Sequence, residues 1–182
     1  TEPFVPGDAR ADVHTHTRRS DGVLEPADLV RQAHAAGVRL FAIADHDNLA
    51  AYRELTAPGA DPLPDGLDLV PAVEINAVTR DLDLDLPEGE LHVLGIGVDP
   101  SDDAFEAAIA AQRGARRLRF TATVVRLRDI GVPVDAHLPE GVMESDDALG
   151  RPTLARALVA AGHAESVEDA FRRILGHGLP GY

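Results

Sequence analysis

Short apolar segments alternate with segments of helical periodicity over the first hundred residues, and this alternation limits the fold more than any other feature. The apolar segments are predicted strands at residues 11–16, 39–44, 67–73 and 91–98. Predicted helices at 26–36 and 48–56 separate the first three, and the earlier helix begins at Pro26 and ends before Gly37. Strands that are apolar along nearly their whole length are typical of a parallel sheet covered by helices. The sequence therefore predicts an α/β fold with a parallel sheet.

The second half of the chain has a different pattern. Predicted helices lie at 102–129, 152–161 and 166–175, and a turn-rich stretch lies at 132–149. We see no further apolar strand of the first type in this half. We therefore interpret residues 11–100 as the sheet-bearing part and residues 101–182 as a helical cap or insertion.

Histidines and carboxylates stand at or near the ends of the predicted strands. His14 and His16 are two residues apart, so on a strand both imidazoles point to the same face and can reach one ion. Asp21 follows in a Ser-Asp-Gly turn that can fold its carboxylate back over that point. A lone His-x-His pair would more often be two ordinary histidines.

The other three strands repeat this arrangement. His46 follows the second strand, Glu74 ends the third and His92 opens the fourth. Each has an ordinary alternative: a helix N-cap at Asp47 or Asn48 beside His46, a salt bridge from Glu74 to an arginine, and a core role for His92. Adjacent strands lie ~4.8 Å apart, so the groups should converge. One polynuclear metal site explains this better than four coincidences, and without cysteines its ligands must be histidines and carboxylates.

Four sequence runs that carry these residues resemble a known superfamily. They are DVHTHTRRSDG, FAIADHDN, VPAVEINA and LHVLGIGVDP. All four resemble the PHP (polymerase and histidinol phosphatase) phosphoesterases. The segment GRPTLARALVAAGHAESVEDAFRRILGHGLPGY is similar to the nucleoside 3′,5′-bisphosphate phosphatase branch, which also includes 5′-3′ exoribonucleases acting on short RNA. The resemblance implies a distorted (β/α)7 barrel, whose first half is present here, with an inserted helical cap.

The resemblance also implies up to three divalent ions, with Glu74 shared between two of them. The first ion would be held by His14, His16 and Glu74, the second by Asp21 and His46, and the third by Glu74 and His92. In this interpretation Asp21 and Glu74 are also catalytic. Mn²⁺ is the expected metal, with Fe²⁺ or Zn²⁺ open as alternatives, because nitrogen and oxygen ligands alone do not select among them.

Arginines are concentrated at residues 113–128, although the chain as a whole has a formal net charge of -14. Arg116 and Arg117 match the position at which the family binds substrate phosphate, and Arg151 is a third candidate. A solvated helix face is the alternative for most of the arginines in this stretch. The family often has histidine where this chain has Thr153, which weakens the expectation of phosphate binding there.

The function implied is hydrolysis of a phosphomonoester of a small nucleotide, such as a nucleoside 3′,5′-bisphosphate, by attack of a metal-bound hydroxide. One alternative is a 5′-3′ exoribonuclease on short 5′-phosphorylated RNA, although 4% aromatic residues disfavour a long stacking channel. Another is a non-catalytic metal-binding module or an inactive fragment. The acidic charge disfavours long duplex nucleic acid as a partner.

Relatives continue beyond the cap with further barrel strands that carry an Ala-His-Pro histidine and an Asp-x-His pair. Neither pattern follows His92 here, so we expect the remaining strands to be missing from this chain. A longer protein or a second chain would supply them, and the 182 residues alone would be inactive. No apolar run approaches the ~20 residues of a membrane span, and we expect a cytoplasmic location. The acidic run at 81–90 is predicted to be an exposed hairpin connection.

Overall fold

The computed structural model describes residues 10–78, 90–143, 147 and 149–182. The chain forms two compact units, Thr1–Ala110 and Ala111–Tyr182, and each has a hydrophobic core of its own. The boundary between them falls inside the long helix α3 (Asp103–Asp129). The predicted helical cap at 101–182 therefore shares one helix with the sheet-bearing unit, and its status as an insertion stays a prediction.

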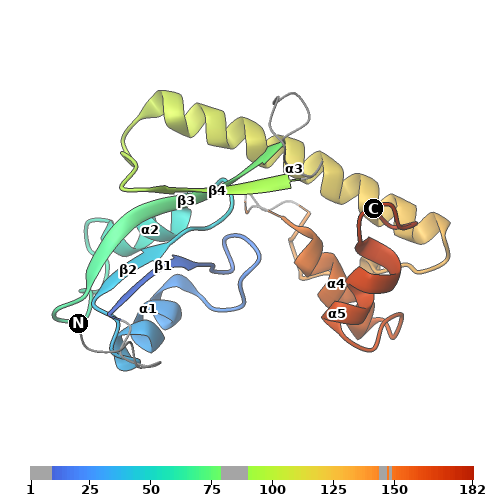
Figure 1. Ribbon diagram of the computed structural model, residues 1–182, viewed down its shortest axis with the longest axis horizontal. Helices are drawn as coiled ribbons and strands as arrows, with labels where there is room; N and C mark the ends of the chain where they lie inside the picture. The colour runs from blue at the N-terminus through green and yellow to red at the C-terminus, as the bar shows by residue number, and fades with distance from the viewer. Residues whose placement is uncertain (1–9, 79–89, 144–146, 148) are drawn as a thin grey trace, which may run out of the picture. The chain divides into compact units, whose positions relative to one another are not determined.

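The first unit contains a four-stranded sheet in the order β1-β2-β3-β4 (Figure 1). Its elements are β1 (Ala11–Thr15), α1 (Pro26–Ala35), β2 (Leu40–Ile43), α2 (Ala50–Thr56), β3 (Asp68–Val78) and β4 (Glu90–Ile96). The mixed α/β character and the parallel pairing of β1, β2 and β3 agree with the sequence analysis. The sheet is not parallel throughout as predicted, because β4 runs antiparallel to β3, the direction that a hairpin connection between these strands implies.

The direction of β4 follows from the short connection that precedes it. A parallel neighbour needs a crossover of about a dozen residues or more, usually a helix, whereas an antiparallel neighbour can follow a short loop. Only residues 79–89 separate β3 from β4, and no helical pattern was predicted there. The predicted connection at 81–90 itself lies outside the described residues, apart from Glu90 at the start of β4.

Strand β3 is longer than predicted, which changes the position of Glu74. The predicted strand ended at Glu74, but β3 continues to Val78, so Glu74 lies in its middle. The first part of β3 pairs with β2, from Asp68 to Pro71, and the second part pairs with β4, from Ala72 to Val78. The strand does not end at the charged residue because β4 supplies a new hydrogen-bonding partner where pairing with β2 stops.

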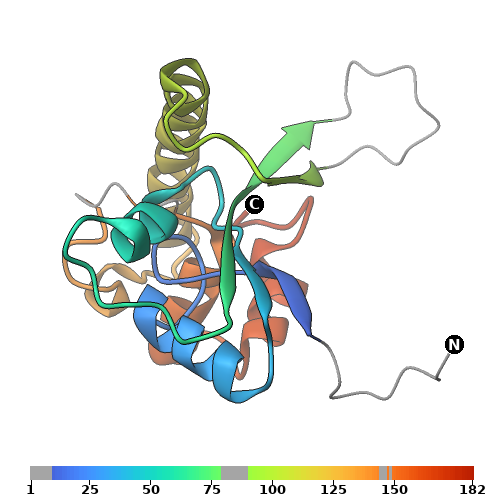
Figure 2. The ribbon, with the colours of Figure 1, turned by 90° about the vertical axis from the view of Figure 1, so that its left-hand side faces the viewer.

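The two faces of the sheet bury different kinds of side chain. Phe41 and Ile43 of β2 pack with Val30 of α1 and Ala51 of α2, and both helices lie on this side of the sheet (Figure 2). The opposite face buries small residues, among them Ala42, Ala44 and Ala72. Because side chains alternate along a strand, Glu74 continues the face of Ala72. The face of small side chains therefore leads to the candidate site.

The second unit is helical. It contains most of α3, a 3-10 turn η1 (Asp135–His137), α4 (Arg151–Ala160), α5 (Val167–Ala170) and a π-helical turn η2 (Phe171–Leu175). The predicted helices at 102–129 and 152–161 are confirmed, whereas the one predicted at 166–175 divides into α5 and η2. Its core contains Phe120, Leu127, Leu154 and Leu158. Over the described ranges, none of the helices combines the length and the apolar character that crossing a membrane requires.

Candidate metal centre

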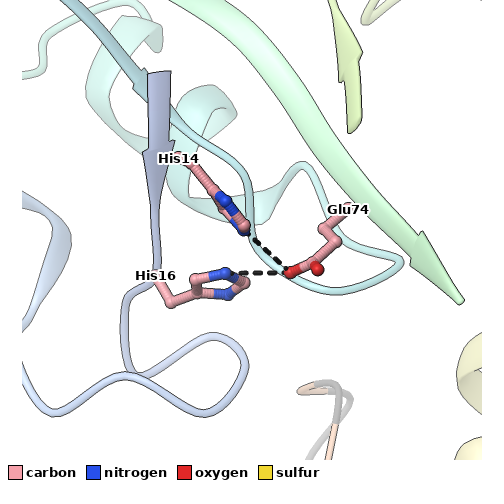
Figure 3. Close-up of side chains that lie close together, drawn as sticks. All are labelled: His14, His16 and Glu74. Carbon is pink, nitrogen blue, oxygen red and sulfur yellow. Dashed lines mark hydrogen bonds and ion pairs between the residues drawn. The ribbon is translucent and has the colours of Figure 1, made fainter. Parts of the chain in front are cut away.

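Strand β1 and the residue after it bring two imidazoles to one carboxylate. The pairing register between β1 and β2 shifts between Asp12 and Thr15, so β1 is irregular around His14. His14 Nε2 lies 3.2 Å and His16 Nε2 lies 2.9 Å from Glu74 Oε2 (Figure 3). The two rings are 5.2 Å apart, centre to centre. The expected convergence of these three side chains is present in the structure.

His46 reaches the same carboxylate from the end of β2. A parallel bridge pairs His46 with Glu74, and backbone bonds flank it: Asp47 N–H donates to the Glu74 carbonyl at 3.0 Å, and Glu74 N–H donates to the Asp45 carbonyl at 3.2 Å. Asp47 has a φ of 48°, in the left-handed region that non-glycine residues seldom adopt. His46 Nδ1 lies 3.4 Å from Glu74 Oε2. Backbone pairing therefore sets this contact. The N-cap of α2 is Leu49 rather than Asp47 or Asn48, and Asn48 Oδ1 accepts from the N–H of Ala50, the first residue of α2.

His92 arrives from the antiparallel strand. It lies opposite Asn76 in the ladder, and its Nδ1 forms a short hydrogen bond with Glu74 Oε1, a diagonal neighbour on the same face. In a parallel β4, a residue near the start of the strand would lie beside the start of β3, far from His46. The reversed direction of β4 is therefore what brings His92 to the cluster.

The Glu74 carboxylate is surrounded by imidazoles and is 2% exposed. Burial alone would raise the pKa of Glu74, but His46, the hydrogen bonds with His14 and His92, and nearby His16 outweigh burial and hold that pKa below its usual value. The alternative of a salt bridge from Glu74 to an arginine is not seen among the described residues. A buried carboxylate held in its charged form by histidines is suited to binding a cation.

Asp21 joins the cluster from the loop after β1. Its Oδ1 lies 3.3 Å from His16 Nδ1, and its Oδ2 lies 3.5 Å from His46 Nε2. Burial lowers the pKa of His16, and this effect exceeds the opposing attraction of the Asp21 carboxylate. Neutral imidazole is the form that binds a metal, so this shift favours metal binding by His16.

All six predicted ligands fall into three overlapping groups, and within each group the ligand atoms lie within 4.8 Å of one another. The groups are His14, His16 and Glu74; His16, Asp21 and His46; and His46, Glu74 and His92. Every donor is a nitrogen or an oxygen, which fits Mn²⁺, Fe²⁺ or Zn²⁺. His46 Nδ1 is buried and makes no hydrogen bond among the described residues. This nitrogen faces the Glu74 carboxylate but has no hydrogen-bonding partner in the described part of the chain, and a bound cation would supply the missing partner.

Three neighbouring polar residues were not assigned a role from the sequence. The Asp45 carboxylate accepts hydrogen bonds from Thr17 and Ser20, and all three side chains are buried. Burial raises the pKa of Asp45 against the opposing effect of these bonds. The available signal was the placement of Asp45 directly after a buried strand and directly before His46.

The arginines predicted to bind substrate belong to the second unit, whereas the ligand cluster belongs to the first. Arg117 donates to the Met143 carbonyl at 3.4 Å, and the Arg151 guanidinium lies 5.1 Å from the centre of the Tyr182 ring. Arg116 is in α3, one residue before Arg117. Thr153 is buried in the first turn of α4. Phosphate binding by Arg116, Arg117 and Arg151 stays a prediction.

Comparison with known proteins gives relatives over nearly the whole chain. The chain is 33% identical to the 5′-3′ exoribonuclease Rnm of Salmonella typhimurium over 180 residues, covering 94% of this chain and 55% of the relative. It is 29% identical to the 3′,5′-nucleoside bisphosphate phosphatase of Chromobacterium violaceum over 177 residues, covering 96% of this chain and 58% of the relative. The chain thus spans little more than half the length of these curated relatives. No protein-family model matches it.

A solved structure agrees with the sequence relatives. A protein of Bifidobacterium adolescentis, described as a candidate metal-dependent phosphoesterase, superimposes with a TM-score of 0.78 at 34% identity, covering 94% of this chain and 57% of that one. The relatives share the motif-bearing first unit and the helical second unit, since the matches extend over both. These similarities are consistent with the PHP superfamily of phosphoesterases, which the four motif-bearing runs of the sequence resemble.

Proposed function

We propose that the chain carries the metal-binding part of a phosphoesterase that removes a phosphate from a small nucleotide. The observation that supports this most is the convergence of three overlapping groups of nitrogen and oxygen donors on the buried Glu74 carboxylate. A group of histidines with a purely structural role would not need a buried carboxylate that has four imidazole rings as neighbours. The names of the relatives, a bisphosphate phosphatase and an exoribonuclease, agree with phosphoester hydrolysis.

In this proposal the ligand residues have distinct tasks. Bound divalent ions supply Lewis acidity toward the phosphoryl oxygens and an activated water. Glu74 contributes a fixed negative charge that its burial shields from water, and its two oxygens face different histidines. Asp21 is 18% exposed against 2% for Glu74, so Asp21 is the carboxylate that solvent and substrate can reach. We therefore assign charge balance between ions to Glu74 and the orientation of a reacting water to Asp21.

Two substrates of the same chemical class follow from the relatives. A nucleoside 3′,5′-bisphosphate is the first, with Arg116, Arg117 and Arg151 as proposed contacts for the phosphate that is not cleaved. Short 5′-phosphorylated RNA is the second, and the identity to the Salmonella exoribonuclease favours it. Both need a small phosphate-binding region, and neither needs a long nucleic-acid channel.

The ligand count supports a larger catalytic assembly. Six side chains serve three groups, with three of the six shared, whereas such ions usually take four to six ligands each. We propose that a complete (β/α)7 barrel, formed with protein outside these residues, adds the remaining ligands. His14 and His92 are about half exposed, at 48% and 46%, so the cluster has accessible sides for them.

The test compares the two substrates after loading with Mn²⁺. The 182-residue chain, and any longer polypeptide that contains it, would be assayed on adenosine 3′,5′-bisphosphate and on a short 5′-phosphorylated RNA. Release of inorganic phosphate supports the phosphatase, whereas release of mononucleotides supports the exoribonuclease. Mn²⁺ binding without turnover of either substrate in the longer polypeptide would point instead to a non-catalytic module.

A further inference from the structure

The loop that carries Asp21 is closed tightly by its own backbone. Gly22 N–H donates to the Thr17 carbonyl at 2.9 Å, and Ser20 N–H donates to the same oxygen at 3.1 Å. A side chain at Gly22 would place its Cβ 2.2 Å from the His16 carbonyl oxygen. The loop therefore folds back on the end of β1, and Asp21 stands between the two bonded positions.

The Asp45 carboxylate fixes this loop from the end of β2. Its Oδ1 accepts from Thr17 N–H at 2.7 Å and from Ser20 Oγ–H at 2.5 Å, and its Oδ2 accepts from Thr17 Oγ1–H at 2.6 Å. Asp45 and Thr17 are fully buried, and Ser20 is 6% exposed. Three buried bonds hold Thr17, at the start of the loop, and Ser20, directly before Asp21.

Asn48 provides a second attachment from the same segment. Its Nδ2 donates to the Arg19 carbonyl at 3.0 Å, while its Oδ1 accepts from Ala50 N–H at 2.8 Å. The segment Asp45–Asn48 thus contains the cluster residue His46. It also contains Asp45 and Asn48, which bind the loop that carries a second cluster residue, Asp21. The positions of His46 and Asp21 are therefore set by one short piece of backbone.

We propose that Asp45 is a positioning residue, which holds the Thr17–Gly22 loop so that Asp21 reaches His16 and His46. Asp45 is not among the six residues of the donor groups, and it acts through the residues of this loop. This inference rests on the proposed function, because it assumes that Asp21 binds a divalent ion. Partners of this kind, one contact removed from the ligands, typically change metal affinity 10- to 100-fold when they are replaced.

The same network also orients His16. The Ser20 hydroxyl gives its proton to Asp45, so its oxygen is an acceptor for His16 Nδ1, 3.3 Å away. Asp21 Oδ1, the other neighbour of Nδ1, is also an acceptor. The proton of the neutral ring therefore belongs on Nδ1, which leaves Nε2 with a free lone pair on the side of Glu74. Asp45 thereby supports two members of the cluster, one through Ser20 and one through the loop.

The test measures Mn²⁺ binding by equilibrium dialysis in Asp45→Asn, Thr17→Val and Thr17→Ser variants, with the melting temperature recorded for each. The Asp45→Asn change would present amide protons to groups that now donate. Thr17→Val would remove, at nearly constant volume, the hydroxyl that donates to Asp45 and accepts from Arg19 N–H at 3.1 Å. Thr17→Ser keeps the hydroxyl and should retain binding. Asp169→Asn replaces a buried aspartate of the second unit and is the control for the loss of a buried carboxylate.

Asp45→Asn, Thr17→Val and Asp21→Asn should each weaken Mn²⁺ binding roughly 10- to 100-fold, whereas Thr17→Ser and Asp169→Asn should keep wild-type affinity. The loss in the Asp21→Asn, Asp45→Asn double variant should be smaller than the sum of the two single losses, because Asp45 acts in part through Asp21. If Asp45→Asn does not fold, the comparison of Thr17→Val with Thr17→Ser tests the positioning role.

Wild-type Mn²⁺ affinity in the folded Asp45→Asn and Thr17→Val variants would overturn the positioning role. Equal losses of affinity in Thr17→Val and Thr17→Ser would also overturn it, as would an additive loss of affinity in the double variant. Failure of the proposed function gives a different result. In that case wild-type protein does not bind Mn²⁺, or Glu74→Gln binds it as well as wild type, and the positioning role falls with it.

Discussion

Glu74 is the residue through which the cluster is connected. Its Oε2 faces His14, His16 and His46, and its Oε1 faces His92. Two of the three donor groups include it, so changing this one side chain alters both. The neutral amide of the same size separates the effect of charge from that of packing.

Glu74→Gln should therefore weaken Mn²⁺ binding by at least about tenfold, since a change one contact further away already costs 10- to 100-fold. His34→Gln is the matched control: His34 is outside the cluster and contacts the Asp65 carbonyl at 3.2 Å. Calorimetric titration with Mn²⁺ gives both affinities. Equal binding by Glu74→Gln and His34→Gln would show that the carboxylate charge is not used.

Gly22 tests the loop at a single backbone position. Gly22→Ala should lower the free energy of unfolding by about 1–3 kcal/mol, because the new Cβ meets the backbone of His16 and Thr17 rather than a flexible side chain. Gly114→Ala is the control, since a Cβ there meets nothing within 4 Å and Gly114 lies inside α3. That change should raise the free energy of unfolding by about 0.5–1 kcal/mol. Urea unfolding measures both, and equal effects of the two would contradict the tight closure of the loop.

Among the elements, α1 and α4 were predictable because apolar spacing, proline starts and glycine ends are local signals. The general prediction of a parallel sheet was wrong for β4, whereas the hairpin connection predicted at 81–90 implies the antiparallel direction that β4 has. Pairing direction depends on contacts far apart in the chain, and the parallel pattern of the earlier strands was extended too far. The end of β3 was misplaced at Glu74 because a charged residue was taken to end a strand.

The convergence of the six side chains was predicted better than the sheet that holds them. In the sequence each of these residues stands beside a predicted strand end or a turn, so His14, His46 and Glu74 could be placed together before the sheet was known. The interactions of Asp45 with Thr17 and Ser20 could not be foreseen, because hydroxyl side chains in a loop offer no periodic signal. Their bonds span 25 and 28 residues and depend on the folded geometry.

The start of α5 gives a prediction that depends on pH. Ser166 Oγ accepts from Asp169 N–H at 3.1 Å, and Asp169 Oδ2 accepts from Glu165 N–H at 3.2 Å, while Arg172 and Arg173 also bond to Asp169. The Glu165 N–H bond, with these arginines, holds the pKa of Asp169 below its usual value. The stabilisation is therefore complete above the unfolded pKa, about 3.9, and is lost as pH falls through the lower folded pKa.

Asp169→Asn should accordingly melt below wild type at neutral pH, and the difference should shrink as the pH falls below about 4. Thermal melts followed by circular dichroism from pH 7 to pH 3 would measure this difference. A gap that stays constant over that range would mean that Asp169 contributes by packing rather than by charge.

At the scale of the whole molecule, each of the two units has its own hydrophobic packing, and the chain has a formal net charge of -14. The ligand cluster draws all its residues from the first unit. A divalent cation that binds the folded cluster lowers the repulsion between the negative charges near it, and it lowers the free energy of the folded state. The stabilisation is about 2.7 kcal/mol when the free ion is at 100 times its dissociation constant.

Mn²⁺ should thus raise hydrogen-exchange protection in the first unit, most of all around Thr17–Gly22 and β3. Protection of α4, whose buried side chains belong to the separate core of the second unit, should change little. Exchange measured by mass spectrometry with and without Mn²⁺ tests this, with Glu74→Gln as the control that removes the effect. A uniform rise over both units, or the same rise in Glu74→Gln, would contradict it.

The division of β3 between two partners has a consequence for the evolution of related chains. Inserting or deleting one residue in β3 would turn Glu74 to the opposite face, because side chains alternate along a strand. Lineages that keep the cluster can therefore substitute freely at many positions of Asp68–Val78 but cannot change its length. Length differences should instead collect between α2 and β3, at residues 57–67, where added residues alter no alternation. An aligned set of homologues that retain all six ligands should show gaps there and none inside β3.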